Sequence, residues 1–171
     1  MSFLLFLGLF SLRGGHSVET TFTKRTGDKG IVKHTHYGTA VACRHPPQLP
    51  ADLRIYARSG DRVYSDNTVA IVVAKGHIPA PDVAGDLLFD AMDFAPFPGD
   101  PSVPDYDKTL PDLPWPWIFG LGDVSGPSNE LPNGQVTFPV TASDYVRGTS
   151  KQSTILYVLN YIPLFSFLND A

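Results

Sequence analysis

Cysteine and charge are scarce in this 171-residue sequence, and each scarcity narrows the class of protein. Cys43 is the single cysteine, so no intrachain disulfide can form, which favours a reducing compartment over the surroundings of small secreted domains. Charged residues make up 18% of the chain, and the formal net charge is −4. This balance argues against non-specific binding of duplex DNA, which needs clustered Lys and Arg. We therefore expect an intracellular protein, nuclear or cytoplasmic.

Long apolar runs are also missing, although both ends of the chain carry short ones. Ser2–Phe10 (SFLLFLGLF) is far shorter than the ~20 apolar residues of a spanning helix, so membrane insertion is not expected. No Lys or Arg precedes this run, and SLRGGHS is a poor cleavage site, so a secretory signal is the minority alternative. At the other end, Asn160 and Pro163 interrupt Ile155–Leu168, which favours a buried strand followed by an apolar tail.

The sequence lacks the short motifs that mark common catalytic sites. It has no G-x-S-x-G nucleophile elbow, no Walker A loop and no H-E-x-x-H zinc motif. The members of a Ser/His/Asp triad can be distant in sequence, but no cluster here points to one. The sequence thus favours a protein that is not an enzyme, and no cofactor is expected.

Short segments rich in β-branched and apolar residues recur along the chain, separated by turn-forming residues. Asn67–Lys75 (NTVAIVVAK) is nearly continuous in apolar character, which is typical of a central strand buried on both faces. No long amphipathic helix or fixed-period repeat is evident. The sequence therefore predicts an all-β barrel or β-sandwich of about seven strands. The predicted strands are Tyr37–Cys43, Leu53–Arg58, Asn67–Lys75, Leu87–Phe94, Trp117–Val124, Gln135–Thr141 and Ser153–Tyr161.

The pattern divides the chain into three parts. Residues 1–33 are expected to be a poorly ordered N-terminal segment, because 14–33 are polar and rich in Thr, Lys and Gly. Residues 34–161 form the predicted all-β domain, and 162–171 form a C-terminal tail. Within the domain, Ala95–Pro116 carries seven Pro and four Asp, which predicts a long surface loop.

The strand after this loop favours an oligonucleotide/oligosaccharide-binding (OB) barrel. Trp117–Val124 contains Gly120 and Gly122, and glycines inside a strand mark a bulge, a sharp bend or a close approach of another chain. A bent strand followed by the hairpin signal Asn133-Gly134 suits the first strand of an OB-like barrel. IFGLGDVSG, TFPVTASDYVRG and KQSTILYVL are then predicted to be its first three strands, with Tyr37–Phe94 as a further sheet.

The stretch from Tyr37 to Leu159 also resembles a group of uncharacterised fungal proteins with an OB-like region. The resemblance rests on the strings DNTVAIVVAK, FPGDP, PWIFGLGDVSG and SDYVRGTSKQSTI. It implies an OB-like β-barrel region in this chain. The group has no assigned activity, so the resemblance informs the fold rather than the function.

Two stretches, LRIYARSGDRVY and SDYVRGTSKQS, combine basic and aromatic residues. Single-stranded nucleic acid is bound by aromatic faces that stack on bases and by cations that follow the phosphates. Strand alternation puts Arg54, Tyr56 and Arg58 on one face. The alternative is that Arg and Tyr simply cover the solvent side of a sheet. The residues expected to contact nucleic acid are Arg54, Tyr56, Arg58, Arg62, Tyr145, Arg147, Lys151 and Trp115.

Histidines and aspartates provide weaker candidates for metal binding. His34 and His36 would face one side of a strand, and Cys43 and His45 share that spacing. Without a Cys-x-x-Cys partner or a nearby carboxylate, exposed histidines are the favoured interpretation, and no metal site is expected. Four aspartates of the Pro-rich loop lack the spacing of a calcium loop and are interpreted as turn starters. These are Asp100, Asp105, Asp107 and Asp112.

These observations favour a non-catalytic OB-like domain that binds single-stranded nucleic acid as part of a larger assembly. One alternative is a protein-interaction or structural β-domain that uses the Pro-rich loop, Trp115 and Trp117 as its contact surface. Another is a secreted sugar-binding β-sandwich whose two Trp residues stack on sugar rings.

The two tryptophans and the core give structural expectations. Pro116 keeps both neighbours extended, so we expect Trp117 to cap the barrel end and Trp115 to be the more exposed. The predicted core contains Val69, Ile71, Val73, Phe119, Leu121, Phe138, Ile155 and Tyr157.

Overall fold

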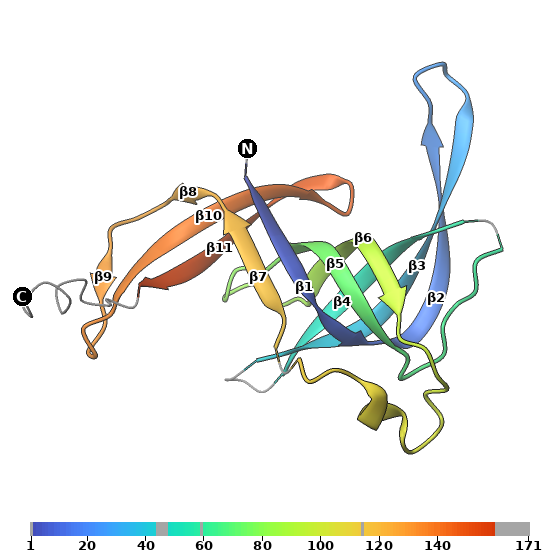
Figure 1. Cartoon of the computed structure of the whole chain (residues 1–171). Helices are drawn as coiled ribbons and strands as arrows, with labels where there is room; N and C mark the ends of the chain where they lie inside the picture. The colour runs from blue at the N-terminus through green and yellow to red at the C-terminus, as the bar shows by residue number, and fades with distance from the viewer. Residues whose placement is uncertain (1, 44–47, 59, 114, 160–171) are drawn as a thin grey trace, which may run out of the picture.

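The computed structural model describes residues 2–43, 48–58, 60–113 and 115–159, and most of these residues lie in β-strands (Figure 1). The predicted all-β fold is confirmed, and each of the seven predicted segments contains strand residues. The predicted strand Trp117–Val124 is divided at Gly122 into two strands, and residues 160–161 of the last predicted strand, with the predicted tail 162–171, lie outside the described residues. The strands are β1 (Phe3–Ser11), β2 (Arg13–Thr23), β3 (Lys29–Ala42), β4 (Gln48–Ala57), β5 (Val69–His77), β6 (Leu87–Pro96), β7 (Trp117–Leu121), β8 (Asp123–Val124), β9 (Asn129–Glu130), β10 (Val136–Val146) and β11 (Thr149–Leu159).

The first six strands form a barrel with the strand order of an OB fold. The large sheet runs β2-β3-β4-β6-β5-β1-β7, and its pairs are antiparallel except for β4 and β6, which are parallel. β2 lies at one end of the sheet order and β1 near the other, yet only Leu12 separates them in the chain. β1 and β2 therefore follow one another as a single bent strand, and the sheet curls until it closes at this strand.

The OB-like barrel is thus present, but the sequence placed it in the wrong part of the chain. The segment predicted to be the first barrel strand is β7, which pairs with the edge of β1 opposite β5 and is not one of the six barrel strands. Residues 14–33, predicted to be poorly ordered, form most of β2 and the beginning of β3. Both strands extend beyond the barrel as a hairpin (Figure 1), whose largely solvent-exposed faces explain its polar composition.

The core of the barrel forms around β1, because its even-numbered side chains point inward. Leu4, Phe6 and Phe10 are each 1% exposed. The ring of Phe89 on β6 lies 4.6 Å from that of Phe6 and 5.5 Å from that of Phe10. Burying each side chain of this size contributes about 1.5–3 kcal/mol. The N-terminal apolar run is therefore a core strand in this fold.

The predicted core is correct for Val69, which is 8% exposed, and wrong for three other residues. Ile71 is 37%, Phe119 49% and Leu121 50% exposed. The alternate side chains of β5, around Val72, point into the barrel instead, so the strand is buried on one face rather than two. Phe119 and Leu121 are exposed because β7 lies at the edge of the sheet. The remaining predicted core residues, Val73, Phe138, Ile155 and Tyr157, are half-buried.

A second sheet, in the order β11-β10-β8 with β9 also beside β10, packs against the barrel. The predicted turn at Asn133-Gly134 joins β9 to β10, and Gly134 has the positive φ of +79° that such a turn uses. Lys75 of β5 forms a 2.8 Å ion pair with Asp144 of β10, whose side chain is 9% exposed. This contact helps to fix the second sheet on the barrel.

The Pro/Asp-rich loop is anchored to the barrel by Tyr106, which lies in the short 3-10 helix η1 (Tyr106–Thr109). Tyr106 is 6% exposed, and its hydroxyl accepts a hydrogen bond of 3.1 Å from the backbone N–H of Val69. Asp100 accepts hydrogen bonds from the backbone and the hydroxyl of Ser102, at 2.9 and 2.7 Å, as expected of a turn starter. Across the described ranges, no helix has the length and apolar character needed to cross a membrane.

Candidate functional site

Two of the predicted binding residues lie together on the outward face of β4. Leu53 points into the barrel and is fully buried. Arg54 and Tyr56 occupy the alternate positions of the strand, so their side chains point outward. Tyr56 is 64% exposed, and its ring meets the imidazole of His34 edge-on at a centroid distance of 6.2 Å. Arg58 is exposed just beyond the end of β4. The prediction that Arg54, Tyr56 and Arg58 share one strand face is correct for Arg54 and Tyr56, whereas Arg58 lies beyond the end of β4.

The loop after β4 folds over the same end of the barrel. The hydroxyl of Tyr37, a core residue of β3, accepts a 2.9 Å hydrogen bond from the backbone N–H of Tyr64. The ring of Tyr64 lies 5.4 Å from that of Phe94 on β6. The carboxylate of Asp61 accepts a hydrogen bond from the backbone N–H of Arg58. These contacts hold the loop against β3 and β6, so its side chains border a defined surface.

Three hollows that share Tyr56 as a lining residue surround this end of β4. Their volumes are about 380, 350 and 260 Å³. Arg58 borders the first two, and Arg62 borders the third. We refer to this surface as the β4 groove, defined by Lys33, Tyr56, Arg58, Arg62, Tyr64 and Phe94.

The β4 groove carries both signs of charge. The side chains of Lys33, Arg58 and Arg62 make no ion pair with any residue that the structure describes. Three carboxylates, Glu19, Asp61 and Asp93, also border the hollows. The groove can therefore place cations against an anionic ligand, but its own net charge is small.

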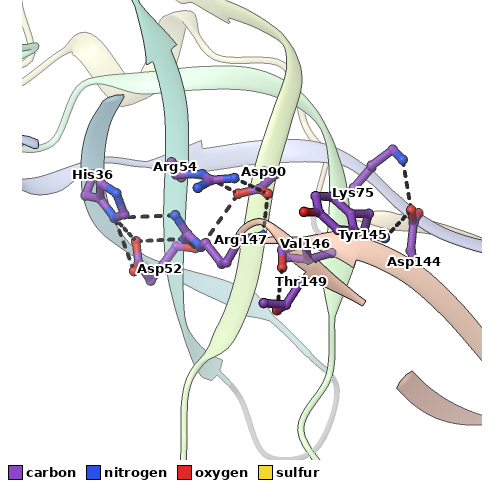
Figure 2. Close-up of polar contacts among 10 residues, drawn as sticks. All are labelled: His36, Asp52, Arg54, Lys75, Asp90, Asp144, Tyr145, Val146, Arg147 and Thr149. Atoms are coloured by element: carbon purple, nitrogen blue, oxygen red, sulfur yellow. Dashed lines mark hydrogen bonds and ion pairs between the residues drawn. The ribbon is translucent and has the colours of Figure 1, made fainter. Parts of the chain in front are cut away.

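Beside the groove, Arg147 reaches the β4 face from the second sheet (Figure 2). Arg147 and Gly148 are the two turn residues between β10 and β11, with φ of +58° and +78°. Positive φ at both positions defines a type I′ turn, which favours Asn or Gly over Arg at the first position. The contacts of the Arg147 side chain explain why an arginine occupies this turn position.

Arg147 joins an arginine cluster that consists of His36, Asp52, Arg54, Asp90 and Arg147 (Figure 2). Its Nη2 donates to the backbone carbonyl of Asp52 at 2.7 Å and lies 3.1 Å from the Oδ1 of that residue. Its backbone N–H donates to Oδ2 of Asp90 at 2.8 Å. Arg54 forms a bidentate pair with Asp90, through Nε at 2.8 Å and Nη2 at 2.6 Å.

The cluster pairs two guanidinium groups with two carboxylates, so neither arginine is free for a phosphate. Burial lowers the pKa of Arg147 from its usual value, and the charges of Asp52 and Asp90 partly oppose that shift. The side chain of Arg147 is 14% exposed. Arg54 and Arg147, both predicted to contact nucleic acid, are thus engaged in holding β4, β6 and the β10–β11 hairpin together.

His36 sits at the edge of the cluster, between Asp52 and Arg147. Its Nδ1 lies 3.2 Å from Oδ1 of Asp52 and 3.4 Å from Nη1 of Arg147. The nitrogen donates to Asp52 when it carries a proton and accepts from Arg147 when it does not. Burial lowers the pKa of His36, Asp52 opposes this by raising it, and Arg147 adds to the lowering.

The histidine candidates are arranged as the spacing predicted, on one face of β3. A third imidazole, that of His16 on β2, stacks on His36 at 5.6 Å. The thiol of Cys43 donates to the carbonyl of Val41, and His45 lies outside the described residues. Over the ranges that the structure covers, no group of three or more His, Cys, Asp or Glu is placed to hold a metal ion.

The other three predicted contacts lie away from the β4 groove. Tyr145, on β10, is 63% exposed. Lys151, on β11, lies opposite Asp144 of β10. Trp115 borders an apolar hollow of about 230 Å³ together with Trp117. The expected difference between the tryptophans is wrong, since Trp117 is 60% and Trp115 50% exposed. Trp117 begins an edge strand whose outward face is uncovered, so it does not cap the barrel.

The predicted contacts did not include the carboxylates of the cluster or three members of the groove, Lys33, Tyr64 and Phe94. Asp90 and Phe94 reach the site because β6 pairs in parallel with β4, which places Asp90 opposite Arg54. Parallel pairing joins strands that are distant in sequence and leaves no local signal. The one available clue was the polar Asp90 within the apolar alternation of Leu87–Phe94.

Comparison with known proteins finds a likeness among solved structures only. No protein-family model matches this sequence, and no curated protein matches it. Among solved structures, a deletion mutant of the single-stranded DNA binding protein from Thermus aquaticus is similar over 90% of this chain and 74% of its own. The TM-score is 0.44 and the sequence identity is 9%.

Proposed function

We propose that this OB-like domain binds single-stranded nucleic acid, without catalysis, in the β4 groove. The observation that carries the proposal is the position of Tyr56. It is 64% exposed on the strand pair β3–β4, and it lines all three hollows at this end of β4. In OB folds this strand pair corresponds to the second and third barrel strands, whose outer face is the usual site for oligonucleotides and oligosaccharides.

Stacking supplies the main attraction in this proposal. A base stacked on an aromatic side chain contributes about 1–3 kcal/mol. Tyr56 offers an exposed ring, and the Tyr64–Phe94 pair forms the wall of the neighbouring hollow. Because any base can stack, we expect binding with little sequence preference.

The cations of the groove contribute a smaller, salt-dependent part. Lys33, Arg58 and Arg62 can contact at most about three phosphates, so log Kobs should fall with log[salt] with a slope no steeper than about −2. The neighbouring carboxylates reduce this contribution further. The same argument excludes strong binding to duplex DNA, since an acidic chain lacks the required basic surface.

Fluorescence anisotropy with a labelled single-stranded oligonucleotide of about 16 nucleotides tests the proposal. Tyr56→Ala should weaken binding roughly tenfold, which corresponds to the loss of one stacked base. Arg58→Ala should weaken it less and make the salt slope shallower by about 1. Tyr145→Ala is the matched control for Tyr56, because its ring is equally exposed on β10, outside the groove. Lys108→Ala is the control for charge.

Three outcomes would contradict the proposal. The full-length protein could fail to bind the oligonucleotide at low salt, or Tyr56→Ala could bind as well as the Tyr145→Ala control. Glycan titrations run in parallel could also saturate where the oligonucleotide does not, which would point to sugar binding.

A further inference from the structure

The outer face of β7, β1 and β5 forms one apolar surface that the described residues leave largely uncovered. Residues paired across strands point to the same face, and here the pairs are Leu121 with Phe3, Phe119 with Leu5, and Trp117 with Leu7. On the other side of β1, Leu7 lies opposite Val73 and Leu9 opposite Ile71. We refer to this surface as the apolar face, with members Phe3, Leu5, Leu7, Leu9, Ile71, Val73, Trp117, Phe119 and Leu121.

The apolar face explains a feature of β1 that the barrel alone does not. A strand that is apolar at every position is typical of sheets buried on both sides. The even positions of β1 fill the barrel, whereas Leu5, Leu7 and Leu9 stay only half-buried on the outside. Among the described residues, Leu113 and Trp115 of the Pro-rich loop border Leu7 and cover this side only in part, which leaves room for a second layer.

The face is large enough for an interface between proteins. Trp117 is 60%, Phe119 49% and Leu121 50% exposed, and Trp115 and Ile71 extend the surface at 50% and 37%. Scaled by typical side-chain areas, the exposed apolar surface is roughly 600 Å², most of the ~800 Å² that each partner buries in a standard interface. This is the upper end of the range of about 300–600 Å² for the largest apolar patch on a monomer, and such patches are often functional.

We propose that this face pairs with the same face of a second copy, forming a two-fold symmetric dimer. Lys75 lies opposite Leu5 and therefore on the same side of the sheet, but its ammonium group is paired with Asp144, and the other side chains of the face are apolar. A nucleic acid or a charged partner would therefore find no complementary group, whereas a second copy matches it. A two-fold dimer sets the same patch against itself, and two such sheets can pack face to face at ~10 Å. The groove at Tyr56 does not take part, so this proposal is independent of nucleic-acid binding.

Sedimentation velocity of the full chain, from low to high micromolar concentration, tests the dimer. We expect a species of twice the 18.6 kDa chain mass. Phe119→Glu places a charge within the face, beside Leu5, and should halve the mass. Leu156→Glu is the matched control, because Leu156 is 67% exposed on β11, outside the face, and this variant should remain dimeric. Cooperative thermal unfolding of each variant confirms that it folds. If Phe119→Glu does not fold, Leu121→Lys takes its place in the experiment.

The two tryptophans supply a second readout, since both border the hollow on this face. Dilution of the wild-type protein should increase iodide quenching as the dimer dissociates. A wild-type protein that stays monomeric at high micromolar concentration would overturn the proposal. So would a Phe119→Glu protein that remains dimeric. If the monomer shows protected tryptophans that become quenchable when residues 160–171 are deleted, that segment is the occupant and the second copy is excluded.

Discussion

The backbone N–H of Arg147 donates a 2.8 Å hydrogen bond to Oδ2 of Asp90, so the tip of the β10–β11 hairpin is bound to β6 of the barrel. Asp90 also accepts both hydrogen bonds of the bidentate Arg54 pair. One carboxylate therefore joins β4, β6 and the second sheet. Its side chain is 17% exposed, which makes the loss of a partner more costly than at a surface ion pair.

Arg147→Asn should destabilise the protein without disturbing the turn. Asn is favoured at a type I′ position, so the substitution removes the guanidinium and leaves the backbone conformation acceptable. We expect the free energy of unfolding in urea to fall by about 1–3 kcal/mol, because Asp52 and Asp90 lose a cation. Arg58→Asn, at an exposed arginine outside any ion pair of the described chain, should change it by less than ~0.5 kcal/mol. Equal effects of the two substitutions would show that the cluster does not hold the hairpin.

The sequence predicted most strands because each one carries a local pattern, and it failed where the answer depends on distant partners. Asn67–Lys75 was identified as a strand from its β-branched residues. Its buried side was misassigned, because only the packing of β1 and β6 decides whether Ile71 or Val72 faces the core. The polar segment 14–33 was mispredicted for a different reason. It pairs with itself as a hairpin, from Glu19 with Lys33 to Thr23 with Lys29, and such exposed strands need no apolar pattern.

The candidate site shows the same division between local and distant information. Two-residue alternation was enough to place Arg54 and Tyr56 together on β4. The roles of the two residues differ, since Arg54 is held by Asp90 while Tyr56 stays exposed. That difference follows from the parallel β4–β6 register, which lies beyond the reach of local pattern. Arg147 was identified as a candidate for its charge, but its function in the fold follows from the hairpin that carries it.

Stability should fall as the pH is lowered below the ordinary pKa of histidine. Burial lowers the pKa of His36 below 6.5, with Asp52 opposing and Arg147 and His16 adding to the shift. The unfolded chain therefore binds a proton more readily than the folded one. The stabilisation is complete above pH 6.5 and is lost as the pH falls through the lower, folded-state pKa.

His36→Gln isolates this contribution. Burial also lowers the pKa of His34 and of His77, so the wild-type protein should lose stability from all three residues in acid. The free energy of unfolding in urea, measured from about pH 7.5 to about pH 5, should decline less steeply in His36→Gln than in the wild type. Parallel curves would mean that His36 titrates alike in the folded and unfolded states.

The junction between the two sheets depends on Gly122. Of the three possibilities for a glycine in this segment, a bulge, a bend or a close approach of backbone, the structure shows a close approach of β10 here. A Cβ atom at this position would lie 2.7 Å from the carbonyl carbon of Thr141 and 3.0 Å from the backbone nitrogen of Ala142. Both are backbone atoms of β10, which cannot turn aside as a flexible side chain can. Gly122→Ala must therefore push β8 away from its pairing with β10 at Thr141 and Asp123.

We expect Gly122→Ala to lower the free energy of unfolding by about 1–3 kcal/mol, the usual cost of overpacking. Gly85→Ala is the matched control, because its Cβ would meet no atom within 4 Å and its φ is not in the left-handed region. There the alanine restricts the unfolded chain and should leave stability unchanged or raise it by up to ~1 kcal/mol. The two variants differ only in what surrounds the added methyl group, so urea unfolding of both measures the contact with β10 directly. If Gly122→Ala proves as stable as Gly85→Ala, the second sheet is not held at this junction, and its attachment must rest on Lys75 and the arginine cluster.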